Sequence, residues 1–122
     1  NEAARWFRKA ADQGDANAQF NLGNTHHEKG VAQDDNEAAR WYRKAADQGF
    51  VKAQCNLGAM YFHGIGVAEN HKQSARWYRK AADQGLSQAQ HILAQMYQDG
   101  KGVAKDFNEA VRWYRKAADQ GF

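Results

Sequence analysis

The chain has 122 residues, no proline, a single cysteine and a formal charge of +3. This length is enough for one domain with a buried core, and the single cysteine excludes an internal disulfide. The small positive charge does not favour a nucleic-acid partner, and no apolar stretch approaches the roughly 18 residues of a membrane span. The polar first five residues do not resemble a signal peptide, so the compartment stays undetermined.

The dominant feature of the sequence is an internal repeat of about 36 residues. The segment Arg-Trp-aromatic-Arg-Lys-Ala-Ala-Asp-Gln-Gly occurs four times, with its tryptophans at Trp6, Trp41, Trp77 and Trp113. A fixed period of this length is typical of a solenoid in which each repeat is one supersecondary unit. The repeat therefore predicts an all-α array of helical hairpins.

The first predicted element is a single helix over residues 1–14, equivalent to the second helix of the later repeats. Three complete repeats follow, at residues 15–49, 50–85 and 86–121. Neither end has the polar capping helix that solenoids normally carry. We expect either a fragment of a longer array or apolar ends that stack chain on chain.

Each complete repeat begins with a helix, here named helix A, that starts near Ala16, Val51 or Ser87. In the second and third repeats it leads into a turn with two glycines, Gly64-Ile65-Gly66-Val67 and Gly100-Lys101-Gly102-Val103, which permit positive φ. The first turn, Lys29-Gly30-Val31, is shorter and has lost one glycine. We expect it to be tighter and locally distorted.

The second helix of each repeat, helix B, is amphipathic and has clear end signals. Its predicted N-caps are Asp35, Asn70 and Asp106, and its predicted C′ residues are Gly49, Gly85 and Gly121. One face carries small and aromatic residues at helical spacing, which in the first full repeat are Ala38, Trp41, Tyr42, Ala45 and Ala46. A lone hairpin cannot bury these rings, so we expect neighbouring hairpins to stack on them.

The combined motif, Ala-Gln-x-x-Leu-Gly-x-Met-Tyr-x-x-Gly-x-Gly-Val followed by Trp-Tyr-Arg-Lys-Ala-Ala-Asp-Gln-Gly, resembles the Sel1-like repeat, a relative of the tetratricopeptide repeat. The resemblance covers essentially the whole chain. It implies a right-handed α/α superhelical solenoid with A helices on the concave face. It also implies that the chain is an adaptor that assembles protein complexes, as in bacterial signalling, envelope and host-interaction systems or in eukaryotic protein quality control. A cysteine-rich branch associated with β-lactam binding is less similar, because Ala45 and Ala46 stand where its cysteine is expected.

The helix A positions that differ between repeats predict the partner site. Five positions in each A helix fall within a sector of about 100°, and they match the peptide-contacting positions of tetratricopeptide hairpins. The predicted groove consists of Asn17, Phe20, Asn24, His27, Lys52, Cys55, Ala59, Phe62, Gln88, His91, Gln95 and Gln98, with Glu28, His63 and Asp99 at the fifth position. Phe20 and Phe62 are its expected apolar anchors. The alternative is that this face varies because it is only solvated surface.

Other chemistry has little support in the sequence. His26 and His27 are adjacent and point about 100° apart, and no His-x-x-x-His or Cys-x-x-Cys occurs. We expect His26 to be a partly buried hydrogen-bonding residue and Cys55 to be half-exposed. Ser74 and Ser87 lie in no nucleophile motif. The sequence therefore predicts no metal, no cofactor and no enzyme activity.

A basic ridge runs along the B helices, because Arg-x-x-Arg-Lys recurs in all four copies. Each copy has an aspartate four residues after its second arginine, and three copies have a glutamate three residues before the first. We expect these pairs to leave a solvated, self-neutralised face. The predicted function is thus a scaffold that binds a protein or peptide segment on the A helices. A structural spacer or end-to-end self-association is the alternative, and a polyanion-binding ridge is the weakest candidate.

Overall fold

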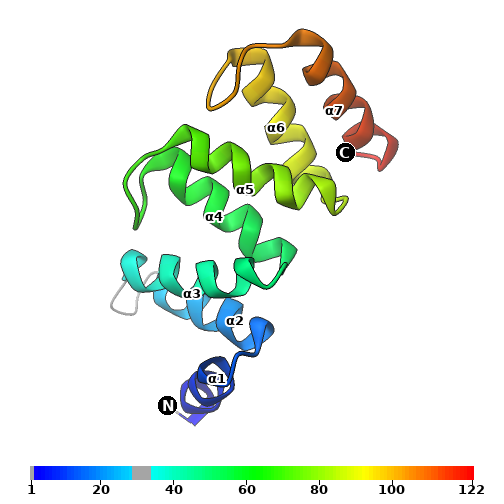
Figure 1. Ribbon diagram of the computed structural model, residues 1–122. Helices are drawn as coiled ribbons and strands as arrows, with labels where there is room; N and C mark the ends of the chain where they lie inside the picture. Colours follow the sequence, from blue (N-terminus) through cyan, green and yellow to red (C-terminus); the bar gives the residue numbers. More distant parts are fainter. Residues whose placement is uncertain (1, 29–33) are drawn as a thin grey trace.

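The computed structural model describes residues 2–28 and 34–122. Within these residues the chain forms seven α-helices and no strand: α1 Glu2–Asp12, α2 Ala16–His27, α3 Asp35–Asp47, α4 Val51–His63, α5 His71–Asp83, α6 Ser87–Asp99 and α7 Phe107–Asp119. The helices stack in chain order, and the termini lie at opposite ends of the array (Figure 1). The predicted fold class, an all-α superhelical solenoid of helical hairpins, is confirmed.

The array has two different edges. The short turns that lead from a B helix into the next A helix lie on one side, and the longer loops within hairpins lie on the other (Figure 1). The main contacts between elements join helices that follow one another, with α2–α3, α4–α5 and α6–α7 as the hairpins. The helix α1 packs on α2 and has the place of a B helix.

The ends of the helices follow the sequence signals closely, with one correction. Asn70 and Asp106 are N-caps as predicted, but the cap of α3 is Asp34, whose Oδ1 atom accepts a hydrogen bond from the Glu37 amide. The prediction of Asp35 was wrong because the cap lies seven residues before the tryptophan in every repeat, and Asp35 is already helical. The shortened turn Lys29-Gly30-Val31 lies outside the described residues.

The second glycine of each long loop is required by a close approach between repeats. Gly66 has φ of 72°, and a Cβ atom there would lie 2.2 Å from the carbonyl oxygen of Asp35. Gly102 repeats this arrangement one hairpin later, with 2.1 Å between its hypothetical Cβ atom and the carbonyl oxygen of His71. Each loop is thereby seated against the first turn of the preceding B helix.

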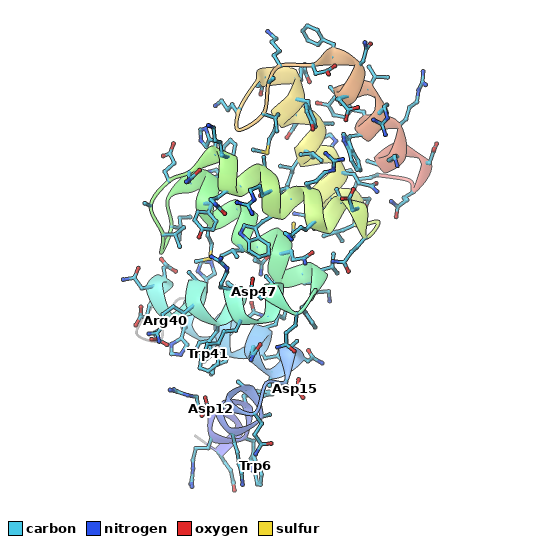
Figure 2. The ribbon with its side chains drawn as sticks, viewed as in Figure 1. Trp6, Asp12, Asp15, Arg40, Trp41 and Asp47 are labelled. Atoms are coloured by element: carbon cyan, nitrogen blue, oxygen red, sulfur yellow. The ribbon has the colours of Figure 1, made fainter. Side chains whose placement is uncertain are left out.

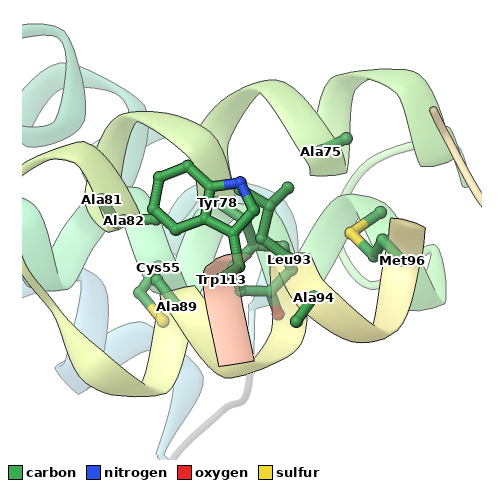
Figure 3. Packing of buried hydrophobic residues seen from close by; sticks show 10 residues of the cluster. All are labelled: Cys55, Ala75, Tyr78, Ala81, Ala82, Ala89, Leu93, Ala94, Met96 and Trp113. Atoms are coloured by element: carbon green, nitrogen blue, oxygen red, sulfur yellow. The ribbon is translucent and has the colours of Figure 1, made fainter. Parts of the chain in front are cut away.

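The core lies between successive hairpins and is built from the predicted face of the B helices. Trp41, Trp77 and Trp113 are each no more than 6% exposed, and each packs against apolar residues of the preceding repeat. Figure 3 shows Trp113 of α7 over Ala81 and Ala82 of α5. Trp6 of α1 is not covered by a preceding hairpin among the described residues and is 63% exposed. Figure 2 shows its side chain at the N-terminal end of the array.

Buried glutamines connect the hairpins through a repeating chain of hydrogen bonds. Gln54, at the start of α4, donates from Nε2 to the carbonyl oxygen of Ala46 at 3.2 Å and accepts from Gln84 Nε2 at 2.7 Å. The same two bonds recur around Gln19 and around Gln90. Each glutamine thus joins the C-terminal ends of two successive B helices to the A helix between them.

Candidate partner-binding site

The predicted groove residues lie on α2, α4 and α6, and most of them are open to solvent. The exposed members are Asn17, Asn24, His27, Lys52, Gln88, Gln95 and Gln98, while Phe20, Ala59, Phe62 and His91 are half-buried. These residues are here called the helix A stripe. The structure brings them onto consecutive A helices, and whether a partner binds there stays a prediction.

The two expected apolar anchors have different surroundings. Phe20 packs into the core, with its ring centroid 5.7 Å from that of Tyr42 and 5.1 Å from that of Phe50. Phe62 stacks on His71 at 4.6 Å between ring centroids and also lines a surface hollow. Phe62 is therefore the more available anchor of the two.

Cys55 does not contribute open surface to the stripe. Its side chain is 6% exposed and belongs to the core cluster between the second and third repeats. The expectation of a half-exposed thiol was wrong, because Cys55 lies among the ring of Tyr78 and the apolar residues of α5 and α6 (Figure 3). Burial raises the pKa of the Cys55 thiol, which disfavours the reactive thiolate.

A hollow of about 260 Å³ opens between α4 and α6, at the ends of these helices nearest the loops. Phe62 of α4, Ile92 and Met96 of α6 and Tyr78 of α5 form its apolar lining. His63, Gln95, Asp99 and Lys101 add polar groups. The hollow thus combines an apolar interior with polar residues, which is the composition expected of a ligand site.

The corresponding place between α2 and α4 is polar. The Tyr42 hydroxyl donates to Asn24 Oδ1. Burial raises the pKa of this hydroxyl, and a hydrogen bond with Asn56 lowers it by a smaller amount. Close by, His27 Nδ1 lies 2.8 Å from Asp35 Oδ1. The stripe therefore presents a polar surface at one inter-repeat junction and an apolar hollow at the next.

Arginines of the basic ridge on the B helices interact with tryptophan and aspartate side chains of this same chain. The arginine that precedes lysine in the motif lies over the tryptophan of the following repeat, with Arg43 Cζ 5.3 Å from the Trp77 ring centroid. The same side chain pairs with Asp47 at 3.4 Å, and Arg8–Asp12 and Arg79–Asp83 repeat this pair. The predicted intrahelical pairing is confirmed for these copies. Such engagement lowers the free positive charge that a polyanion would need.

Histidine chemistry does not converge on a site. His91 contacts the rings of Tyr114 and Phe122, with centroids 5.3 and 5.2 Å away. His26 is half-buried as expected, but its Nε2 atom is buried without a hydrogen-bond partner among the described residues, so the expected bond is not made there. Across the described residues, no three His, Cys, Asp or Glu side chains are grouped so that they could hold a metal ion.

These features place the chain in the class of helical-hairpin repeat proteins. A family model for the Sel1 repeat matches residues 1–15, 16–50, 51–86 and 87–122, and the chain therefore belongs to the Sel1 repeat family. Sel1 repeat proteins generally act as protein-interaction scaffolds, and the repeat is a non-enzymatic fold. None of the helices in residues 2–28 and 34–122 has the length and apolar character needed to span a bilayer.

Solved structures of bacterial proteins show the same architecture. The chain is 44% identical to c5321, a protective antigen present in uropathogenic Escherichia coli strains, with a TM-score of 0.93 over 97% of this chain. It spans about a quarter of the length of that antigen, 26%. A Sel1 repeat protein from Oxalobacter formigenes is 42% identical, with a TM-score of 0.89 over 100% of this chain and 92% of its own.

A more distant structure shares the fold alone. The cysteine-rich protein B of Helicobacter pylori is 23% identical, with a TM-score of 0.75 over 99% of this chain and 87% of its own. Comparison with curated protein sequences gives no significant match.

Sequence reasoning missed three of the residues that line the hollow. Tyr78 was assigned to packing alone, and Ile92 and Met96 were not considered as site residues. A signal was present, because Ile92 stands where the first two repeats have Asn21 and Asn56. A change from amide to aliphatic at an otherwise repeated position marks a local change of chemistry.

Proposed function

We propose that the chain is a protein-interaction scaffold that binds a peptide or protein segment along the helix A stripe. The observation that carries this proposal is the hollow between α4 and α6, which contains the stripe residues Phe62 and Gln95. A preformed apolar recess with polar groups around it is the usual form of a recognition hot spot.

The distribution of sequence differences supports the same face. The residues that recur in every repeat, such as Leu57 and Leu93 or the buried alanines, are buried in the core. The residues that differ, such as Lys52 and Gln88, are exposed on the A helices. A framework that repeats and a surface that differs fit an array in which each hairpin presents its own contact.

A photo-crosslinking experiment tests the proposal directly. The photoreactive residue p-benzoylphenylalanine is introduced at Gln95 on the stripe, and at Arg76 on the exposed face of α5 as the matched control. After irradiation in native lysate, the Gln95 variant should give a discrete protein adduct and the Arg76 variant should not. Adducts from Arg76 alone would move the site to the B helices.

End-to-end association of two copies is the second candidate. It is favoured by large apolar residues exposed on the two terminal helices, where Trp6 is 63% and Phe107 is 62% exposed, together with Phe122 at 59%. Light scattering over a hundredfold concentration range should then show a rising mass, and Trp6→Ala should reduce it. A constant monomer mass excludes this candidate.

A further inference from the structure

The interior of the hollow contains a polar group that the chain leaves unsatisfied. Tyr78 is 4% exposed and lines the hollow, and no hydrogen-bond partner for its hydroxyl lies within residues 2–28 and 34–122. The corresponding hydroxyls of Tyr42 and Tyr114 donate to Asn24 and to Gln98. The Tyr78 oxygen is not among the fully buried unpaired atoms, so it reaches the open space of the hollow, where a ligand with the right polar atom can hydrogen-bond to it.

Comparison with the neighbouring repeat shows which hydrogen-bond partners Tyr78 lacks. Tyr42 meets Asn24 on its own A helix and Asn56 on the next one. At the same two places around Tyr78, the chain has Ala59 and Ile92. Neither side chain can hydrogen-bond, which leaves the Tyr78 hydroxyl without a protein partner, and Ile92 also contributes to the apolar lining.

The size and lining of the hollow indicate what it can accept. Its volume of about 260 Å³ lies below the range of roughly 300–1,000 Å³ that is typical of sites for drug-sized molecules. It fits one large side chain of a bound polypeptide. Phe62 and the Met96 thioether favour an aromatic ring, since both aromatic–aromatic and sulfur–aromatic contacts are attractive.

The lining of the hollow carries one cation, Lys101, and one carboxylate, Asp99. The Lys101 ammonium lies 5.6 Å from the Phe62 ring centroid, and none of the described carboxylates forms an ion pair with it. An acidic residue on the ligand would complement Lys101 where it lies closer to that ammonium than to the Asp99 carboxylate.

We propose that this hollow receives a tyrosine side chain of a partner peptide, with the tyrosine hydroxyl hydrogen-bonded to the Tyr78 hydroxyl and a neighbouring carboxylate paired with Lys101. This inference rests on the proposed scaffold function and names the partner chemistry at one junction of the stripe. A tyrosine matches the site because its ring meets Phe62 and Met96 while its polar tip reaches Tyr78. A phenylalanine would fill the same space and leave the hydroxyl unsatisfied.

The test compares two capped pentapeptides, acetyl-Ser-Glu-Tyr-Glu-Ser-amide and its phenylalanine analogue, by NMR titration of the whole 122-residue chain. The tyrosine peptide should shift the amide signals of Phe62, Gln95 and Lys101 and bind about fivefold more tightly, as one added hydrogen bond allows. Equal affinities of the two peptides, or no shift at the hollow up to millimolar peptide, would overturn the proposal.

Variants of the chain assign the effect to the hydroxyl. Tyr78→Phe keeps the ring that packs on Gly58 and should make the two peptides bind equally. The double variant Ala59→Asn, Ile92→Asn rebuilds the polar surroundings of Tyr42 and should also abolish the preference for tyrosine. Thermal unfolding by circular dichroism checks that each variant is folded. A preference that survives Tyr78→Phe in a folded chain contradicts the assignment.

The charge is tested separately. Lys101→Glu should weaken the acidic tyrosine peptide severalfold, and Lys105→Glu, which makes the same charge change farther along the loop, should have a smaller effect. Equal weakening by both variants would mean that the peptide carboxylates respond to the overall positive charge of the loop, and it would contradict a specific ion pair with Lys101. If crosslinks form from Gln95 while the pentapeptides fail, the scaffold function stands and only the tyrosine assignment is wrong.

Discussion

Buried glutamines carry an important part of the framework at the scale of single residues. Gln19, Gln54 and Gln90 are each about 95% buried, with exposed fractions of 4 to 5%. A polar side chain is stable in such a place only when its hydrogen bonds are made, and each of these amides both donates and accepts. The recurrence of glutamine at this position therefore reflects hydrogen bonding between hairpins.

Replacing Gln54 by leucine should lower the free energy of unfolding by about 1 to 2 kcal/mol. The change leaves the Gln84 amide without its partner and removes one bond from the Ala46 carbonyl oxygen. Urea unfolding followed by circular dichroism measures the difference. The same substitution at Gln88, which is exposed, should stay within about 0.5 kcal/mol, and an equal loss there would refute the role of the buried amide.

The stability of the chain should fall at alkaline pH. Burial raises the pKa of the Cys55 thiol above its ordinary value of 9.0 and also raises the pKa of Tyr78. Since both groups lose their protons more easily in the unfolded chain, their contribution is complete below pH 9 and declines as the pH rises above it.

Each of these groups accounts for at most about 1.4 kcal/mol per pH unit. Urea unfolding at pH 8 and pH 10.5 should show the decline, and Cys55→Ala should make it smaller. A stability profile that is the same with and without the thiol would argue against its burial.

The loop glycines determine how tightly consecutive repeats approach at the scale of elements. Gly85 and Gly102 both have positive φ, but a Cβ atom at Gly85 would have open space and one at Gly102 would meet the carbonyl oxygen of His71. The two positions therefore separate the cost of the backbone conformation from the cost of the contact.

Gly85→Ala should cost about 1 to 2 kcal/mol, because it places a side chain in the left-handed region. Gly102→Ala should cost roughly 1 to 3 kcal/mol more, since the loop must also move away from α5. Thermal and urea unfolding of the two variants give the comparison. Equal losses would mean that the loop does not press on the preceding repeat.

Most of the elements could be predicted from the sequence because the repeat supplies several copies of each signal. Helix starts at Ala16, Val51 and Ser87 and the C′ glycines were placed correctly for this reason. The N-cap of α3 was predicted at Asp35, one residue after the true cap at Asp34. The first loop is shorter than the other two, so an alignment that counts from the loop places the cap wrongly. Counting back from Trp41 places it correctly.

The site was less predictable because its character depends on contacts between repeats. The position of Phe20 on the stripe was visible in the sequence, but its burial depends on Phe50, which precedes the next A helix. The chemistry of Tyr78 depends in the same way on Ala59 and Ile92, which come from two different helices. Repeat comparison finds the positions that differ, and only packing shows which of them remain open.

The tryptophans join the hairpins into one cooperative unit at the scale of the whole molecule. Trp77 of α5 belongs to the same buried cluster as Ala38, Tyr42 and Ala45 of α3 and Leu57 of α4. In a solenoid, stability is close to a sum of repeat terms and nearest-neighbour interfaces. A weakened interface should therefore uncouple the repeats on its two sides.

Trp77→Ala should remove about 3 to 5 kcal/mol from this interface and broaden or split the calorimetric unfolding transition. The van 't Hoff enthalpy should then fall below the calorimetric enthalpy. Trp6→Ala, at a position that is 63% exposed, should leave a single transition. A single sharp transition in the Trp77 variant would show that the interface is not what couples the repeats.

The two edges of the array differ in how they resist bending. The edge with the short turns is held by directional hydrogen bonds from Gln54 and its equivalents, whereas at the loop edge Gly66 lies in close van der Waals contact with the first turn of α3. We expect bending to be easiest about the glutamine edge and to change the spacing of the helices mainly at the opposite edge. Phe62 lies in the last turn of α4 and Lys101 in the loop that follows α6, both at that side, so we expect a side chain bound between α4 and α6 to change the curvature of the solenoid. A ligand side chain in the hollow would in this way change the pitch of the solenoid, and with it the relative positions of the contact surfaces on the other repeats.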